Sequence, residues 1–218
     1  MADGREKAYF WVTWLTKLLV GEASCQWAVW FKANHLANSY NQVPSDFDSA
    51  KWHINHTNLL EKQIKRLDKG GASLFLEKQN AFTLEGRTAI LGGRPDLITI
   101  SDGTGTILDV KTGQPSPAHD VQVMIYMYAI PRALPQFQGI NFDGVIVYSD
   151  YEKRIPATSV DANFIDNLGS MITKLASTTA PSRVPSKLEC GFCSITKSDC
   201  PDRIEKTDQS ERNTTDDF

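Results

Sequence analysis

The sequence GRPDLITISDGTGTILDVKTG, residues 93–113, predicts two strands joined by a tight turn. Apolar residues dominate 97–100 and 107–110, which is typical of strands with little solvent exposure. Asp102-Gly103, which lies between them, is a favoured residue pair for a two-residue hairpin turn. We therefore predict a β-hairpin in the interior of the protein.

This hairpin brings two carboxylates together. With a two-residue turn at Asp102-Gly103, paired residues have numbers that add to 205, so Asp96 lies directly opposite Asp109. Opposed side chains have Cβ atoms about 4.5–5.5 Å apart, and two carboxylates there repel unless a proton or a cation lies between them. Oxygen-rich sites of this kind suit Mg²⁺ or Mn²⁺. Lys111 shares the strand face of Asp109, where its ammonium can contact a phosphate or an attacking water, and the Val110 carbonyl can add a ligand.

Two alternatives stay open for this hairpin. Gly105 permits a longer turn, and a slip of one residue would place Asp96 opposite Val110. The strands could also be exposed, with their charges simply solvated. The apolar neighbours count against exposure, because an unpaired Asp or Lys is costly in a strand with little solvent contact.

Helices and strands alternate along the rest of the chain. Expected helices cover the spacing of Phe10, Trp14 and Leu18, then Glu22–Leu36, Ala50–Leu67, Ala118–Ile130 ending at Pro131, and Asp161–Leu175. Expected strands are Ser73–Glu77, Ala81–Leu84, Arg87–Leu91, Arg94–Ile100, Thr106–Lys111 and Gly144–Ser149.

Three further side chains are candidates for the site. Gln122 and Tyr126 lie four residues apart on one face of the helix that follows the Lys111 strand, where they could bind phosphate or orient Lys111. A buried pair that completes the core is the ordinary alternative. His56 shares a stripe with apolar residues on its helix, which is more typical of a core histidine than of a ligand.

Composition indicates a folded protein without membrane spans. Of 218 residues, 41% are hydrophobic and 22% charged, and no apolar run approaches the roughly 20 residues of a membrane span. The N-terminal MADGREK has no continuous hydrophobic region of the kind found in secretory signals, so we expect the protein to be located in the cytoplasm. The formal net charge is −3, and the segment from Glu205 to Phe218 has two basic and five acidic residues. The rest of the chain therefore has equal numbers of basic and acidic residues, which neither indicates nor excludes a nucleic-acid binder.

The four cysteines point to a metal. They are Cys25, Cys190, Cys193 and Cys200, one near the N-terminus and three in a C-x₂-C-x₆-C cluster. In a cytoplasmic protein, such a set favours metal ligation over disulfides. A single distant cysteine plus a cluster of three is less typical of zinc, although zinc, free thiols and a disulfide stay open.

These motifs together resemble a known superfamily. Pro95-Asp96, Asp109-Val110-Lys111 and the Gln122…Tyr126 pair match the signature of PD-(D/E)XK nucleases in their RecB-like branch. The cysteines resemble those of its iron–sulfur members, including the fourth CRISPR-associated protein family and the nuclease domains of AddAB-type complexes.

The resemblance implies an α/β fold with a restriction-endonuclease-like core. In this fold a mixed central sheet is flanked by helices, and a C-terminal cysteine knot closes onto the N-terminal region. It implies a nuclease domain over residues 1–204, with an iron–sulfur segment over 186–201. The polar and acidic composition of 205–218 predicts a disordered tail.

The resemblance also implies roles for individual residues. Asp96, Asp109 and Lys111 would be catalytic and Gln122 and Tyr126 supporting. The ligands of Mn²⁺ or Mg²⁺ would be His56 (with His53 as the nearby alternative), Asp96, Asp109 and Val110. The ligands of a 4Fe–4S cluster would be Cys25, Cys190, Cys193 and Cys200.

The implied activity is hydrolysis of DNA phosphodiester bonds, with exonuclease action on single-stranded ends as in many relatives. Partners would be single-stranded DNA and proteins of CRISPR adaptation or of a helicase complex, in DNA repair, CRISPR adaptation or a phage role. A catalytically weak DNA-binding or scaffold subunit and a zinc-stapled structural protein are the competing hypotheses.

Overall fold

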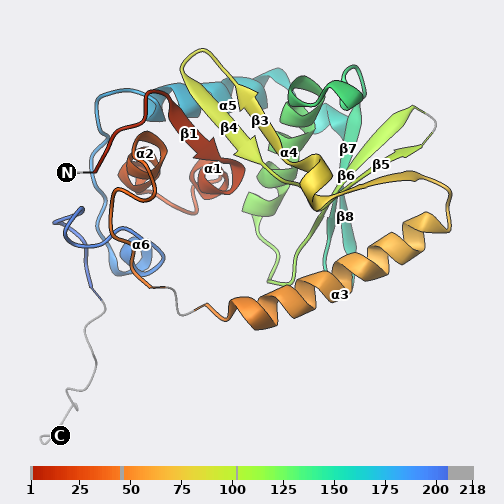
Figure 1. The fold of residues 1–218 in the computed structure, drawn as a ribbon, viewed down its shortest axis with the longest axis horizontal. Coiled ribbons are helices and arrows are strands. Elements are labelled where there is room, and N and C mark those ends of the chain that lie inside the picture. Colours follow the sequence, from red (N-terminus) through yellow and green to blue (C-terminus); the bar gives the residue numbers. More distant parts are fainter. Residues whose placement is uncertain (1, 45–46, 102, 206–218) are drawn as a thin grey trace, which may run out of the picture.

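The computed structural model describes residues 2–44, 47–101 and 103–205, in which the strands form two sheets (Figure 1). The larger sheet has the order β2-β5-β6-β7-β8 and the smaller has the order β1-β4-β3. The strands are β1 (Ala8–Trp11), β2 (Ser73–Leu76), β3 (Phe82–Glu85), β4 (Ala89–Gly93), β5 (Leu97–Ser101), β6 (Thr104–Val110), β7 (Phe142–Val147) and β8 (Glu152–Ile155). The helices are α1 (Val12–Leu19), α2 (Gln26–Asn34), α3 (Ser49–Asp68), α4 (Pro117–Ala133), α5 (Ala162–Leu175) and α6 (Lys187–Gly191). The acidic tail predicted from Glu205 lies, apart from Glu205 itself, outside the described residues.

The predicted hairpin is β5 and β6, and its register is confirmed. Leu97 pairs with Leu108 and Ser101 with Thr104, so paired numbers add to 205 as expected for a two-residue turn. Asp102, the first predicted turn residue, lies outside the described residues, while Gly103 has a φ of 75°, a left-handed conformation that favours glycine. The slipped register is therefore wrong.

The larger sheet is mixed and is covered by a helix on each face. Strand β6 pairs antiparallel with β5 and parallel with β7, and α4 forms the connection between β6 and β7. Leu60 of α3 packs against one face together with Leu97 and Leu108. Ile98 and Ile107 belong to the core cluster that includes α4. Burial on both faces explains why the hairpin sequence is almost continuously apolar, and it confirms the prediction of a mixed sheet flanked by helices.

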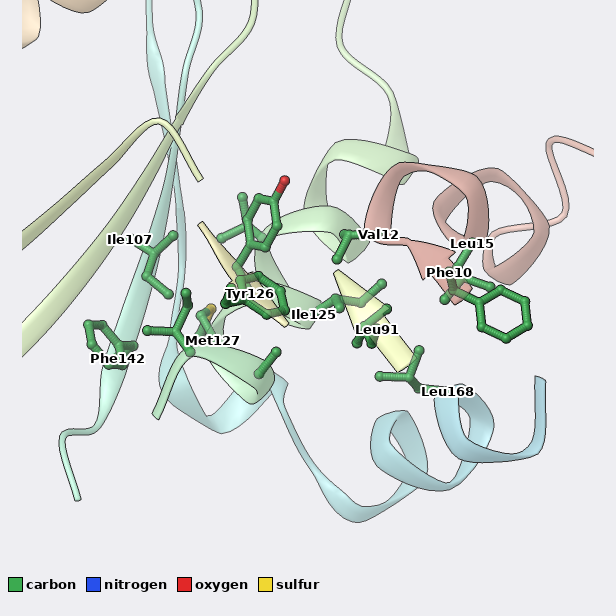
Figure 2. Close-up of a cluster of buried hydrophobic side chains, with 14 of the residues drawn as sticks. Phe10, Val12, Leu15, Leu91, Ile107, Ile125, Tyr126, Met127, Phe142 and Leu168 are labelled. Carbon is green, nitrogen blue, oxygen red and sulfur yellow. The ribbon is translucent and has the colours of Figure 1, made fainter. Parts of the chain in front are cut away.

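Helix α4 lies between the two sheets and is buried on nearly all sides. Ile125 and Tyr126 lie between the large-sheet residues Ile107 and Phe142 and the small-sheet residue Leu91 (Figure 2). A helix that is apolar around its whole circumference belongs in a core. The apolar composition of α4 therefore accounts for its buried position between the sheets.

The N-terminal expectation was wrong in part. Phe10 and Trp11 belong to β1, which pairs parallel with β4, and the helix begins only at Val12. Ala8 and Phe10 are buried whereas Trp11 is exposed, so the same residues also satisfy the two-residue period of a strand. Pairing with β4, about 80 positions away in the sequence, decides between the two periods.

Other elements also differ from the sequence-based expectations. The strand expected over Arg94–Ile100 begins only at Leu97, because Pro95, which has no N–H, separates Gly93 of β4 from β5. Strands β3 and β4 form the smaller sheet with β1. Helix α4 continues past Pro131 to Ala133, since a single backbone donor is lost there and the Leu134 N–H still bonds to the Ile130 carbonyl at 3.0 Å. Strand β8 and helix α6 were not anticipated. None of the helices in the described ranges combines the length and apolar character needed to cross a bilayer.

Gly144 of β7 allows α4 to approach the sheet, and this gives the first testable prediction. A Cβ at this position would overlap Val123 Cγ1 and lie 2.9 Å from Met127 Sδ. We expect Gly144→Ala to lower the free energy of unfolding by about 1–3 kcal/mol, because an overpacked core forces neighbouring groups to shift. The measurement is urea denaturation followed by circular dichroism.

Gly169→Ala is the matched control for this substitution. Gly169 is an exposed position of α5 with no atom within 4 Å of the added Cβ. Alanine is the better helix former, so this change should stabilise the protein by roughly 0.5–1 kcal/mol. Equal effects of the two substitutions would contradict the close contact between α4 and β7.

Candidate functional site

The two predicted carboxylates lie where β5 begins and β6 ends. Asp96 immediately precedes β5, and its Oδ2 accepts a hydrogen bond of 2.7 Å from the Val110 N–H. Asp109 lies within β6 with only 2% of its surface exposed. Val110 thus contacts Asp96 through its N–H, whereas the sequence pointed to its carbonyl as a possible ligand. The hairpin register is what brings the two acids to the same end of the sheet.

Three side chains form a network with the Asp109 carboxylate. Lys111 Nζ lies 2.6 Å from Asp109 Oδ2 and donates to Gln122 Oε1 at 2.9 Å. Gln122 Nε2 donates to Asp109 Oδ1 at 3.1 Å and to the Tyr126 hydroxyl at 3.1 Å. Gln122 and Tyr126 are both buried and come from one face of α4, as their spacing predicts. The structure therefore brings together four residues that the sequence analysis assigned to the site.

The environment of Asp109 disfavours its charged form. Burial raises the pKa of this carboxyl to about 6, with a further contribution from the negative charge of Asp96, while the Lys111 ammonium acts in the opposite direction. Shifts of this kind are common where a carboxylate serves chemistry, because charge is concentrated there in a dry environment. The Lys111 ammonium offsets part of the free-energy cost of burying the Asp109 carboxylate.

His56 lies at the site and not simply in the core stripe of its helix. Its Nε2 is 3.2 Å from Asp96 Oδ2, and hydrogen bonding to that carboxylate raises the pKa of the imidazole. The Trp52 ring packs against it with centroids 4.8 Å apart. His53, one turn earlier on α3, is exposed. The distances therefore favour His56 over His53 as the histidine of this site.

Two groups that no sequence pattern indicated hold the backbone around Asp96. The Glu77 N–H donates to the Asp96 carbonyl at 3.0 Å. Asn80, which is fully buried, donates from Nδ2 to the carbonyls of Phe75 at 2.7 Å and Pro95 at 3.4 Å. These contacts fix the short segment between the two sheets. An isolated Asn in a polar stretch gives no sequence signal of such a role.

The donors near Asp96 fit a hard divalent cation in chemical type. They are two carboxylates and an imidazole, a set that suits Mg²⁺ or Mn²⁺. Asp109 Oδ2 is buried, and the Lys111 ammonium 2.6 Å away is its charge partner. Within the same residues, no group of three or more His, Cys, Asp or Glu side chains is already arranged around a metal position. The metal site therefore stays a prediction.

The four cysteines line one small cavity although they come from opposite ends of the chain. Cys25 precedes α2, whereas the other three lie in or after α6, and all four are free thiols. The cavity has a volume of about 30 Å³ and is also lined by Arg183 and Arg203. The C-terminal segment is therefore in contact with the N-terminal region at the cysteines.

Other contacts hold these two segments together. Glu189 accepts hydrogen bonds from the backbone N–H groups of Ser24 at 2.6 Å and Cys25 at 3.3 Å. Ile195 is fully buried against Trp27 and Phe31. In number and type, four thiols around one cavity fit a four-thiolate centre. Because they are not in a ligating arrangement, the iron–sulfur cluster and the cysteine knot stay predictions.

Fold and site together define a mixed α/β protein with a carboxylate and lysine centre at the meeting point of two strands. The sequence model of the PD-(D/E)XK nuclease superfamily matches residues 17–201. This chain belongs to the PD-(D/E)XK nuclease superfamily.

Solved structures and curated proteins do not assign the chain any further. The solved structure titled "Crystal structure of SSO0001" is similar with a TM-score of 0.45 and 18% sequence identity, over 92% of this chain and 89% of that chain. No curated protein matches the sequence. Membership of the superfamily therefore rests on the sequence model alone, and it points to a metal-dependent nuclease.

The Asp109–Lys111 pair gives a prediction about stability and pH. Lys111→Met keeps the apolar stem and removes the ammonium that holds down the Asp109 pKa. A carboxyl whose folded pKa is raised stabilises the protein below its unfolded pKa, and this contribution is lost as the pH rises through the folded value. Because the variant raises the folded pKa further, we expect Lys111→Met to lose more stability at about pH 8 than at about pH 5. Urea denaturation at the two pH values measures this difference.

Lys7→Met is the control for removal of a lysine. Lys7 pairs with Glu85, whose side chain is 70% exposed. An exposed pair contributes at most about 1 kcal/mol, so the change in stability should be small. A loss from Lys111→Met that is the same at both pH values would contradict the coupling between Lys111 and Asp109.

Proposed function

We propose that this protein is a metal-dependent DNA nuclease that hydrolyses phosphodiester bonds, acting as an exonuclease on single-stranded DNA. The observation that supports it best is the convergence of Asp96, Asp109 and Lys111 at the strand ends, in a chain of the PD-(D/E)XK nuclease superfamily. The loss of any one of these three would have favoured a binding subunit without turnover. All three are present, and the two carboxylates interact electrostatically.

Each residue of the site has a role in this proposal. Asp96, Asp109, the Val110 carbonyl and His56 would hold Mg²⁺ or Mn²⁺, which supplies activation of water and stabilisation of charge on the phosphate. Lys111 is the only ammonium within hydrogen-bonding distance of Asp109 among the described residues, and it would assist the attacking water or the developing negative charge. Gln122 and Tyr126 would keep Lys111 and Asp109 oriented through their hydrogen bonds.

The cysteines would hold a 4Fe–4S cluster that joins the two ends of the nuclease domain. Support comes from the shared cavity and from the hydrogen bonds of Glu189 to the backbone next to Cys25. A cluster at this position would stabilise the fold without taking part in the hydrolysis. The proposed cellular role is DNA repair or CRISPR adaptation, with any helicase motor supplied by another chain.

The nuclease proposal is tested by cleavage of end-labelled single-stranded DNA with Mn²⁺ or Mg²⁺. We expect metal-dependent cleavage by the anaerobically purified protein and a loss of at least about 100-fold in Lys111→Ala, because that substitution removes a group that stabilises developing charge. Lys153→Ala is the matched control, since Lys153 is a half-exposed lysine of β8 that pairs with Asp120. It should retain the parent activity.

The two contrary results have different meanings. Equal activity in the parent and in Lys111→Ala would indicate a contaminant or a wrong assignment of the site. No cleavage by a correctly folded, cluster-loaded parent would favour the DNA-binding or scaffold hypothesis instead.

The cluster proposal is tested by metal analysis of the same preparation. We expect a brown protein that contains iron and acid-labile sulfide, and we expect Cys190→Ser to lose both together with thermal stability. Lys197→Ala, in the same segment but not a candidate ligand, should retain them. A colourless protein with one zinc per chain would contradict the iron–sulfur assignment and favour a structural zinc site.

A further inference from the structure

A second cavity adjoins the catalytic network on the side of the smaller sheet. It has a volume of about 520 Å³ and spans all three strands of that sheet, which lie next to one another in Figure 1. Its aromatic lining residues are Tyr9, Trp11, Phe82 and Tyr126. Arg94 is the cation that lines it, and no Asp or Glu of the described residues does so. In a chain with a net negative charge, this is a surface to which a polyanion can bind.

The cavity shares a wall with the proposed catalytic residues. The Tyr126 hydroxyl accepts from Gln122 Nε2, and it also has a hydrogen bond from the Arg94 backbone N–H. Gln122 in turn contacts both Asp109 and Lys111. Arg94 precedes Asp96 by two positions, so their Cα atoms are at most about 7 Å apart. A strand whose phosphate lies at Asp96 and Lys111 would therefore have its neighbouring nucleotide within reach of this cavity.

Trp11 presents an open aromatic surface at the cavity. It is 44% exposed, and its ring meets the Tyr9 ring edge to face at 5.7 Å between centroids. Tyr9 lies directly over the bare backbone of Gly92, where a Cβ would collide with its hydroxyl, and Arg5 packs on the Tyr9 ring at 5.6 Å. Tyr9 is therefore held against the β4 backbone, while nearly half of the Trp11 surface remains exposed to solvent beside it.

We propose that this cavity is a subsite for one unpaired nucleotide of the DNA strand beside the bond that is cleaved. In it, the Trp11 ring stacks on the base and Arg94 contacts a backbone phosphate. The subsite rests on the proposed nuclease function and specifies its substrate, because a base within a duplex is already stacked on its neighbours. Stacking on an aromatic ring tolerates every base, so the subsite selects single strands without selecting sequence.

The test measures binding in a background that does not cleave. In this binding test the parent is the Lys111→Ala protein and not the unsubstituted protein, and Ca²⁺ replaces Mn²⁺. The reporter is the fluorescence anisotropy of a labelled oligothymidine of about 12 nucleotides. We expect Trp11→Ala to weaken binding by roughly 5- to 150-fold, whereas Trp11→Phe, which keeps an aromatic face, stays close to the parent. Binding of a blunt duplex should change little in either variant.

Arg94→Ala tests the phosphate contact separately. It should reduce the slope of log affinity against log salt concentration by about 0.7, the contribution of one phosphate contact in a single strand. Arg132→Ala is the control, because Arg132 is an exposed arginine at the far end of α4 that packs on Tyr128. It should leave the slope unchanged.

A base-deletion scan locates the stacked nucleotide. Oligonucleotides with one abasic position each should reveal a position where loss of the base weakens binding to the parent but not to Trp11→Ala. Such coupling between two removals is a direct sign of contact.

The proposal is overturned by either of two results. One is unaltered single-strand affinity in Trp11→Ala with an unchanged circular dichroism spectrum. Another is the absence of measurable single-strand binding by the parent. Cleavage by the unsubstituted protein is measured in parallel, so a failed subsite with intact cleavage is distinguishable from a failed nuclease with an intact subsite.

Discussion

The carboxylate of Asp109 is almost completely buried, and much of the surrounding structure serves to make that possible. Removing a carboxylate from water costs several kcal/mol unless charge and hydrogen bonds compensate it. Lys111 supplies the opposite charge at 2.6 Å and Gln122 supplies a hydrogen bond. Helix α4 must therefore present Gln122 at the end of β6. Since α4 fills the space between both sheets, the requirements of this one carboxylate and those of the hydrophobic core are met by the same helix.

The segment Gly93-Arg94-Pro95-Asp96 joins the two sheets, and the site lies at that junction. A Cβ at Gly93 would lie 2.8 Å from Phe82 and 2.9 Å from Tyr126, so only glycine lets β4 approach α4 this closely. Pro95 interrupts the strand, and the Glu77 N–H holds the Asp96 carbonyl. Gly93, Pro95 and the Asp96 backbone therefore have structural roles that are independent of catalysis. They also place the smaller sheet beside the network of Asp109, Lys111, Gln122 and Tyr126.

The features that could be predicted from the sequence depend on local geometry. A two-residue turn determines the hairpin register, and the register determines that Asp96 and Asp109 meet. Helical spacing places Gln122 and Tyr126 on one face. In contrast, β1 exists because it pairs with the distant β4, and its Phe10 and Trp11 satisfy the periods of both a helix and a strand. The buried contacts of Asn80 likewise depend on segments that only the fold brings together.

The weak charge of this chain bears on how a nucleic acid would be bound. A net charge of −3 creates no long-range attraction for DNA, and the carboxylates of the site repel phosphate. Affinity must then come from short-range contacts, such as stacking on Trp11 and the single charge of Arg94 at the adjoining cavity. Contacts of this kind are much less sensitive to salt than a basic patch is, and they leave no trace in overall composition. Balanced composition is therefore compatible with a DNA-processing enzyme whose substrate is held by a few groups next to the reacting bond.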